Sequence, residues 1–220
     1  MPPRNCAHPL FARFYTRISP VMDRQGAAGH RQRLLTGLTG QVIEVGAGDG
    51  ANFAYYPDTV SHVQAVEPEP YLRARAVEQA QRVAAPVEVI DGLAERLPAG
   101  DQSVDAVVIS LMLCSVADQA PVLEEALRVL RPEGQLRFYE HVAASCPGRL
   151  QTTQRIADAT VWPWLFGGCH TGRDTAAAIA AAGFVIDEID RFDFPPGQPS
   201  PAAPHILGRA SRPVDEKVSA

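Results

Sequence analysis

A glycine-rich segment near residue 45 has the composition of a ligand-binding loop. It reads Val42-Ile-Glu-Val-Gly46-Ala-Gly48-Asp-Gly50, so a short apolar run leads directly into three closely spaced glycines. Glycine lets the backbone turn sharply and approach a ligand without a Cβ in the way. Gly46, Gly48 and Ala51 also satisfy a relaxed dinucleotide-binding fingerprint with alanine in its third place, so an NAD-dependent enzyme stays open at this point.

Glu44 favours a ligand other than a dinucleotide. It stands two residues before Gly46, at the end of the predicted strand. A carboxylate at that place repels a pyrophosphate and attracts a cationic amino group. We therefore expect Glu44, together with the loop residues Gly46, Ala47, Gly48 and Asn52, to hold a nucleoside ligand that carries such a group.

Later segments fit the same ligand. Glu67-Pro68 ends the next apolar run, 19 residues after Gly48, where an acidic side chain can accept hydrogen bonds from both hydroxyls of a ribose. The segment after the third apolar run is expected to pack against an adenine ring, and the segment after the fourth to line the other end of the ligand. The residues expected to make these further contacts are Leu93, Ala94, Leu111 and Ser115.

His141 is the candidate for acid–base chemistry. It follows the fifth apolar run, at the sheet edge where open α/β folds bind ligands. Histidine titrates near neutral pH, so we expect His141 to orient or deprotonate an acceptor molecule. The alternative is that Glu140 and His141 only anchor the following loop. Cys114 lies in an apolar run and is expected to pack rather than to react.

The segment 162–170, Trp-Pro-Trp-Leu-Phe-Gly-Gly-Cys-His, combines aromatic residues with two adjacent glycines. This composition suits a mobile cover over a small lipophilic acceptor, although aromatic residues also fill ordinary cores. An N-terminal helix can close the site from the other side or serve as a packing arm. Arg173 can clamp an anionic group or pair with Asp174. The residues expected at the acceptor pocket are Phe14, Tyr15, Trp162, Phe166 and Arg173.

The four cysteines show no metal-binding or disulfide pattern. Cys6, Cys114, Cys146 and Cys169 are far apart along the chain and include no C-x-x-C pair. Cys169 and His170 are adjacent, but no third or fourth ligand is spaced to join them. We therefore expect no metal site and regard the cysteines as structural thiols.

The elements that must position these residues alternate between short apolar runs and helical patterns. Two helices, 10–22 and 30–38, come before the first run. The predicted strands are 42–45, 63–66, 87–90, 104–110, 136–139, 184–189 and 205–210, and the later helices are 71–84, 121–130, 149–162 and 174–182. This alternation predicts an α/β fold with a doubly wound, mostly parallel sheet, N-terminal helices and a helical insertion after the fifth strand.

Composition and charge exclude several classes of protein. The 220 residues are 46% hydrophobic, enough for a sizeable core, and the net charge of −5 gives no footprint for nucleic acid. The longest nearly uninterrupted apolar stretch, 176–186, is shorter than the roughly 18 residues that a membrane-spanning helix needs. The first residues contain no continuous apolar run of a secretory signal. We therefore expect a cytoplasmic protein that has no membrane span and acts on a small molecule.

We expect one domain over residues 1–211, followed by a flexible tail over 212–220. Within the domain, 1–39 are expected to form a helical cap and 40–142 the cofactor-binding core. Residues 145–182 are expected to form a helical substrate cover, and 183–211 the last pair of strands.

The ordered motifs resemble the class I S-adenosylmethionine-dependent methyltransferases. The resemblance covers about residues 40–140 and rests on 44–50, Glu67, 94–98 (Ala-Glu-Arg-Leu-Pro), 105–109 (Asp-Ala-Val-Val-Ile) and 128–134 (Arg-Val-Leu-Arg-Pro-Glu-Gly). It implies S-adenosyl-L-methionine as the cofactor, S-adenosyl-L-homocysteine as the product, and a Rossmann-like seven-stranded sheet whose last strand is antiparallel. Leu93 departs from the family, which often has an acidic residue there to contact the adenine amino group. Asp91 is a possible substitute.

A closer resemblance, over about residues 40–210, is to the methyltransferase-like protein 7 branch. It rests on 52–57 (Asn-Phe-Ala-Tyr-Tyr-Pro), 111–116 (Leu-Met-Leu-Cys-Ser-Val), 140–144 (Glu-His-Val-Ala-Ala), 166–169, 173–175 and 204–208. Characterised members of this branch are thiol S-methyltransferases, which implies methyl transfer to a small lipophilic thiol. The animal members have a hydrophobic N-terminal membrane anchor, from which this sequence departs. O-, N- or C-methylation of a quinone-like or natural-product molecule stays open, as does a non-catalytic cofactor-binding module.

Overall fold

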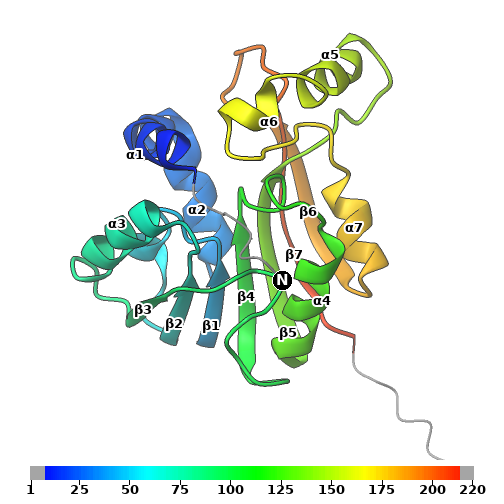
Figure 1. Ribbon diagram of the computed structural model, residues 1–220. Coiled ribbons are helices and arrows are strands. Elements are labelled where there is room, and N and C mark those ends of the chain that lie inside the picture. The colour runs from blue at the N-terminus through cyan, green and yellow to red at the C-terminus, as the bar shows by residue number, and fades with distance from the viewer. Residues whose placement is uncertain (1–7, 214–220) are drawn as a thin grey trace, which may run out of the picture.

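The fold is given by a computed structural model that describes residues 8–213 (Figure 1). The tail predicted over 212–220 lies outside the described residues from residue 214 onward. Two helices, α1 (Pro9–Met22) and α2 (Ala28–Leu35), are joined by a wide helical turn, η1 (Asp23–Ala27). The elements that follow are β1 (Gly40–Val45), η2 (Phe53–Tyr55), β2 (Val60–Val66), α3 (Pro70–Ala80), β3 (Val87–Ile90), β4 (Val104–Ser110), α4 (Ala120–Val129), β5 (Leu130–His141), α5 (Arg149–Asp158), α6 (Trp162–Leu165), α7 (Thr175–Ala181), β6 (Val185–Asp193) and β7 (Pro204–Ser211).

The seven strands form one sheet in the order β3-β2-β1-β4-β5-β7-β6. Every pair from β3 to β5 is parallel, whereas β7 runs antiparallel to both of its neighbours, β5 and β6. The reversal of direction along the chain at β1 and β4 is the switch point where open α/β sheets bind their ligands. The predicted doubly wound, mostly parallel sheet is confirmed.

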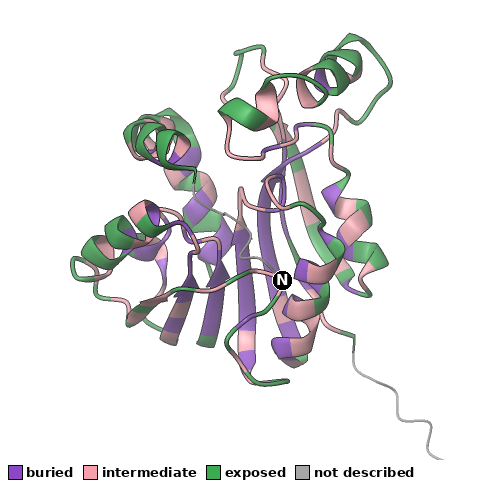
Figure 2. Cartoon of the chain, in the orientation of Figure 1, coloured by how far each residue is buried: buried purple, intermediate pink, exposed green. Residues whose placement is uncertain are grey.

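Neighbouring residues of the central strands belong to two apolar clusters. Val42 and Val108 pack in one cluster with Leu34 of α2, whereas Ile43 packs in the other with Leu123 of α4. The sheet is thus covered by helices on both faces, which explains why its central strands are apolar throughout rather than alternately polar. Figure 2 shows the buried strands between helices whose outer surfaces are exposed.

The two N-terminal helices are separated by a kink at Gly26. Its φ of 124° is unfavourable for any residue with a side chain, so glycine allows the change of direction. After the kink, α2 places Leu34 and Leu35 in the core, while α1 stands at the end of the sheet that carries the loops after β1 and β4 (Figure 1). Within residues 8–213, no helix has both the length and the apolar character needed to cross a membrane.

The helix predicted over 149–162 is wrong at its C-terminal end. It divides into α5, which ends at Asp158, and the short α6, which begins at Trp162. The carboxylate of Asp158 accepts hydrogen bonds from the backbone N–H groups of Thr171 and Gly172. These bonds bring the returning chain against the end of α5, and the intervening residues turn instead of continuing the helix.

Candidate functional site

A cavity of about 400 Å³ lies at the carboxyl ends of β1, β2 and β4, with α1 along one side. Among the predicted cofactor residues, Glu44, Ala47 and Asn52 are buried and do not line this cavity. The predicted cofactor residues that do line it are Gly46, Gly48, Glu67, Pro68, Leu93, Ala94, Leu111 and Ser115. The structure therefore brings together residues from four separate loops that the sequence assigns to one ligand.

The glycine loop packs against its neighbours at the positions that touch the cavity. Gly46 and Gly48 have φ values of 72° and 60°, in the left-handed region. A Cβ on Gly46 would lie 2.4 Å from Met112 Cγ, and a Cβ on Gly48 would lie 3.4 Å from the ring of Tyr15. At Gly46 the loop after β4 thus leaves no room for a side chain, whereas at Gly48 a Cβ would make ordinary contact with Tyr15 and the positive φ is what favours glycine.

Glu67 supplies the carboxylate on the β2 side of the cavity. Its Oε2 accepts a hydrogen bond from the N–H of Gly48 at 2.8 Å, and its Oε1 accepts one from the N–H of Glu69 at 2.9 Å. Burial raises the pKa of Glu67 to about 7, while the two amide hydrogen bonds act in the opposite direction. A carboxylate oxygen has more than one acceptor site, so the fixed side chain still has lone pairs for a ligand.

Glu44 is buried beneath the glycine loop and accepts hydrogen bonds from the segment that follows the glycines. The Nδ2 group of Asn52 and the hydroxyl of Tyr56 each donate a hydrogen bond to its carboxylate at 2.8 Å. Arg31 of α2 donates in turn to Asn52 Oδ1 at 2.9 Å. Burial raises the pKa of Glu44 to about 7, and the hydrogen bonds from Tyr56 and Asn52 lower it. The expected contact of Glu44 with an amino group stays a prediction.

The adenine end of the predicted site contains Leu93 and Ala94, both of which line the cavity. Asp91, the possible substitute for an acidic residue at position 93, does not line it. Its carboxylate instead accepts a hydrogen bond from Arg73 of α3 at 3.1 Å. In the structure, the side-chain surface offered to an adenine ring at positions 93 and 94 is therefore apolar.

Glu140 anchors a loop, as the alternative interpretation of Glu140 and His141 proposed, but the loop is the one after β4. Its buried carboxylate accepts hydrogen bonds from the N–H groups of Met112, Leu113 and Cys114 at 2.8, 3.0 and 3.4 Å. Burial raises the pKa of Glu140, whereas these amide hydrogen bonds lower it. Glu140 thus fixes the loop that carries Leu111 and Ser115 to the cavity.

We expect Glu140→Gln to lower the free energy of unfolding by about 1–3 kcal/mol, because the new NH₂ group would face a backbone N–H that loses its acceptor. Urea denaturation followed by circular dichroism measures the change. Glu133→Gln is the matched control, since Glu133 is an exposed glutamate of the same strand. An equal loss of stability in both variants would contradict the anchoring role.

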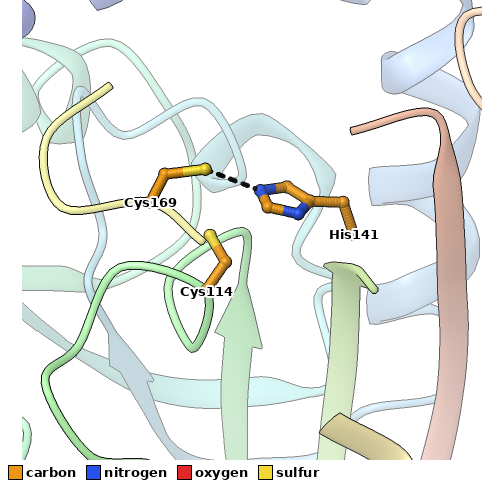
Figure 3. A group of neighbouring side chains, drawn as sticks. All are labelled: Cys114, His141 and Cys169. Atoms are coloured by element: carbon orange, nitrogen blue, oxygen red, sulfur yellow. Dashed lines mark hydrogen bonds between the residues drawn. The ribbon is translucent and has the colours of Figure 1, made fainter. Parts of the chain in front are cut away.

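His141 does not line the cavity, although it lies at the predicted edge of the sheet. Its Nε2 is 3.2 Å from the Sγ of Cys169, and Cys114 lies beside the same pair (Figure 3). The structure thus joins two cysteines that are far apart in sequence, and their histidine neighbour is His141 rather than His170. The role of His141 as a base stays a prediction, and its ring is directed toward the two sulfur atoms (Figure 3).

The N-terminal helix and the 162–170 segment meet beside the cavity. Phe11 and Tyr15 of α1 line it together with Gly167, and a Cβ on Gly167 would lie 2.6 Å from the Phe11 ring. Of the five residues predicted for the acceptor pocket, only Tyr15 is in the lining. Phe11 belongs to the N-terminal helix that the sequence offers as a second wall of the site, and its i, i+4 spacing from Tyr15 places both on one side of that helix.

The remaining predicted acceptor residues connect α1, the 162–170 segment and the loop after β4 to one another. The ring of Phe166 lies 6.4 Å from that of Phe14 and 4.3 Å from that of Trp162, measured between centroids. Arg173 donates hydrogen bonds to the backbone oxygens of Leu113 and Val116. Neither interpretation of Arg173 describes this contact, since the side chain of Asp174 instead caps α7.

Comparison with known proteins places the chain in a family. The methyltransferase domain family matches residues 43–138. Thiol S-methyltransferase TMT1B of Homo sapiens is 36% identical over 187 residues, which cover 80% of this chain and 73% of that protein. Thiol S-methyltransferase TMT1A of Homo sapiens is 31% identical over 210 residues, which cover 91% of this chain and 85% of that protein.

A solved structure supports the fold. Geranyl diphosphate methyltransferase in complex with S-adenosylmethionine superposes with a TM-score of 0.66 at 13% identity, covering 86% of this chain and 85% of that one. The sheet order and the cavity at the switch point agree with this fold. Because the two human relatives match over most of both chains, the protein belongs to the thiol S-methyltransferase family of S-adenosylmethionine-dependent methyltransferases.

Proposed function

We propose that this enzyme transfers the methyl group of S-adenosylmethionine to a small lipophilic thiol. The observation that carries the proposal is the extent of the match to the thiol S-methyltransferases. The methyltransferase domain match ends at residue 138, whereas the match to TMT1A covers 91% of this chain. The similarity therefore extends beyond the methyltransferase domain into residues 145–182, to which, together with α1, we assign the acceptor side of the site.

The lining of the cavity fits S-adenosylmethionine. Gly46 and Gly48 bring bare backbone to its wall, Glu67 offers a carboxylate to ribose hydroxyls, and Leu93 and Ala94 offer apolar surface to adenine. When bound, the cofactor would supply a methyl group on a positively charged sulfur. Attack of an acceptor thiolate on the methyl carbon would form a thioether, and the electron pair of the broken carbon–sulfur bond would stay on the leaving S-adenosylhomocysteine.

This chain contributes mainly alignment and the exclusion of water. Phe11 and Tyr15 of α1 line one side of the cavity, and Gly167 of the 162–170 segment and Val116 of the loop after β4 also line it. We propose that these groups form the acceptor end, which suits a lipophilic molecule. A thiol has a pKa of about 8.5, so a few per cent is already ionised at neutral pH and the demand for a base is modest.

A panel of acceptors tests the proposal. The enzyme and the cofactor are incubated with an alkyl thiol, a phenol, an amine or a quinol, and release of S-adenosylhomocysteine is followed. We expect turnover with the thiol to exceed turnover with each of the others. A response to the phenol or the quinol alone would replace the thiol by an O- or C-methylation acceptor. Turnover with none of the four, despite binding of S-adenosylhomocysteine, would favour a non-catalytic module.

The pH dependence gives a second check on a thiol acceptor. At saturating cofactor, kcat/KM for an alkyl thiol of pKa about 8.5 is expected to rise up to tenfold per pH unit below that pKa and to level off above it. The rise has this sign because the thiolate is the reacting form. A more acidic aryl thiol should shift the break to lower pH. The same break for both thiols would assign it to a group of the protein.

A further inference from the structure

We propose that Cys114, His141 and Cys169 form a binding site for a zinc ion. The three side chains come from separate parts of the fold: the loop after β4, the last residue of β5, and the chain that follows α6 (Figure 3). Their two Sγ atoms and the imidazole nitrogen all lie within 4.8 Å of one another. Two thiolates and an imidazole are ligands that zinc prefers in proteins.

The spacing of the three groups is close to that of a zinc site. Zn–S bonds of about 2.3 Å and Zn–N bonds of about 2.0–2.1 Å in a tetrahedron place the ligand atoms about 3.5–3.8 Å apart. The observed distance from Cys169 Sγ to His141 Nε2 is 3.2 Å, and no pair exceeds 4.8 Å. Shifts of about 1 Å or less in flexible side chains therefore accommodate the ion.

The backbone around the three groups is already fixed. The N–H of His170 donates to the backbone oxygen of Cys114 at 2.8 Å, which ties the Cys169 segment to the loop after β4. Glu140 holds the same loop through the N–H groups of residues 112–114. Such a framework lowers the cost of ordering the ligands when the ion binds.

The histidine ring makes its hydrogen bond to sulfur. Nδ1 of His141 is buried and has no hydrogen-bond partner among residues 8–213, whereas Nε2 contacts Cys169 Sγ, and the edge of the ring packs against His205 at 5.9 Å between centroids. The exposed fractions of Cys114, His141 and Cys169 are 2%, 7% and 7%. This burial distinguishes the site from an incidental cluster of surface groups.

The site has three protein ligands, which leaves a fourth position for water or another small ligand. No fourth histidine, cysteine or acidic group of the described residues joins the cluster. Ser115, whose hydroxyl lies 3.4 Å from Cys114 Sγ, is one of the residues that line the cavity. A bound ion would therefore tie the 162–170 segment to the sheet edge directly behind the wall of the cavity.

Metal binding is measured in an assay that contains no methyl acceptor and requires no catalytic turnover. The full chain, with Cys6 and Cys146 changed to serine so that only the two cluster cysteines remain, is stripped of metal under reducing conditions. It is then titrated with Zn²⁺ against a chromophoric chelator and, separately, with Co²⁺. We expect one equivalent of zinc to bind, and the cobalt protein to show the sulfur-to-cobalt charge-transfer absorption of thiolate ligation. Zinc should also raise the midpoint of thermal unfolding.

Cys169→Ser, Cys114→Ser and His141→Ala are each expected to weaken zinc binding by at least about 100-fold, since even outer-shell changes at metal sites cost 10–100-fold. His170→Ala is the matched control, because this neighbouring histidine is outside the cluster and should leave zinc affinity unchanged. Binding of S-adenosylhomocysteine checks that each variant is folded. If a variant fails to fold, the cobalt spectrum of the parent protein decides.

Three results would overturn the proposal: no stoichiometric zinc binding, a cobalt spectrum without charge-transfer absorption, or equal zinc affinity in the parent and both serine variants. Each of them leaves the acceptor panel unaffected, since the metal titration contains neither thiol acceptor nor cofactor. A failure of the zinc site is thus distinct from a failure of the proposed thiol methylation.

Discussion

Glu67→Ala is expected to weaken the binding of S-adenosylhomocysteine by about 100-fold or more. The substitution removes an acceptor for the ribose hydroxyls, and hydrogen bonds to a charged group contribute about 1.5–3 kcal/mol each. It also frees the N–H groups of Gly48 and Glu69, which the carboxylate holds at 2.8 and 2.9 Å. Isothermal titration calorimetry measures the dissociation constant. Asp91→Ala is the control, because Asp91 is a carboxylate of the adjoining loop that does not line the cavity.

The pH dependence of this affinity separates a ligand contact from a loop support. Burial raises the pKa of Glu67 to about 7 from an ordinary 4.5, and an ionised carboxylate is the better acceptor for hydroxyl groups. Affinity in the wild type should therefore fall as the pH is lowered from 8 to 6, by up to tenfold per unit below 7. Glu67→Gln should flatten this dependence. A steep profile that persists in Glu67→Gln would show that another group controls binding.

The part of the cavity that we assign to the cofactor could be predicted from sequence because its lining residues lie in short contiguous motifs at strand ends. Gly46, Gly48 and Glu67 follow β1 and β2 directly, and parallel strands bring their carboxyl ends to one edge of the sheet. Predicting the parallel sheet was thus enough to bring these motifs together. The assignment of Glu44 depended on the direction of its side chain, which residue spacing does not determine.

The acceptor side could not be predicted to the same depth because its contacts join loops that are distant in sequence. Cys114 and Cys169 meet only because the chain after α6 returns across the loop that follows β4. The contact of Arg173 also joins distant segments, because its partners are backbone oxygens of that loop. Every residue has a backbone oxygen, so the sequence does not indicate which of them Arg173 contacts. Glu140 could be identified from the sequence as a residue that anchors a loop. Which loop it holds depends on how β5 is aligned with β4 in the sheet.

Glu44→Ala is expected to lower the free energy of unfolding by about 2–6 kcal/mol. The substitution leaves the Nδ2 group of Asn52 and the hydroxyl of Tyr56 without their buried acceptor, at about 1–3 kcal/mol for each unsatisfied group. Tyr56→Phe removes one of these donors in advance. In a double-mutant cycle, Glu44→Ala should therefore cost less in the Tyr56→Phe background than in the wild type. Equal costs would show that the hydrogen bond contributes nothing.

The effect of Glu44→Ala should depend on pH with a definite sign. Burial raises the pKa of Glu44 in the folded chain to about 7, above the ordinary 4.5 that applies when the chain is unfolded. Between these values the folded state holds an extra proton, so the wild type loses stability from this group as the pH rises toward 7. The loss caused by Glu44→Ala should thus be larger at pH 5.5 than at pH 8. If the variant instead kept its stability but bound S-adenosylhomocysteine much more weakly, Glu44 would be a direct ligand of the cofactor amino group.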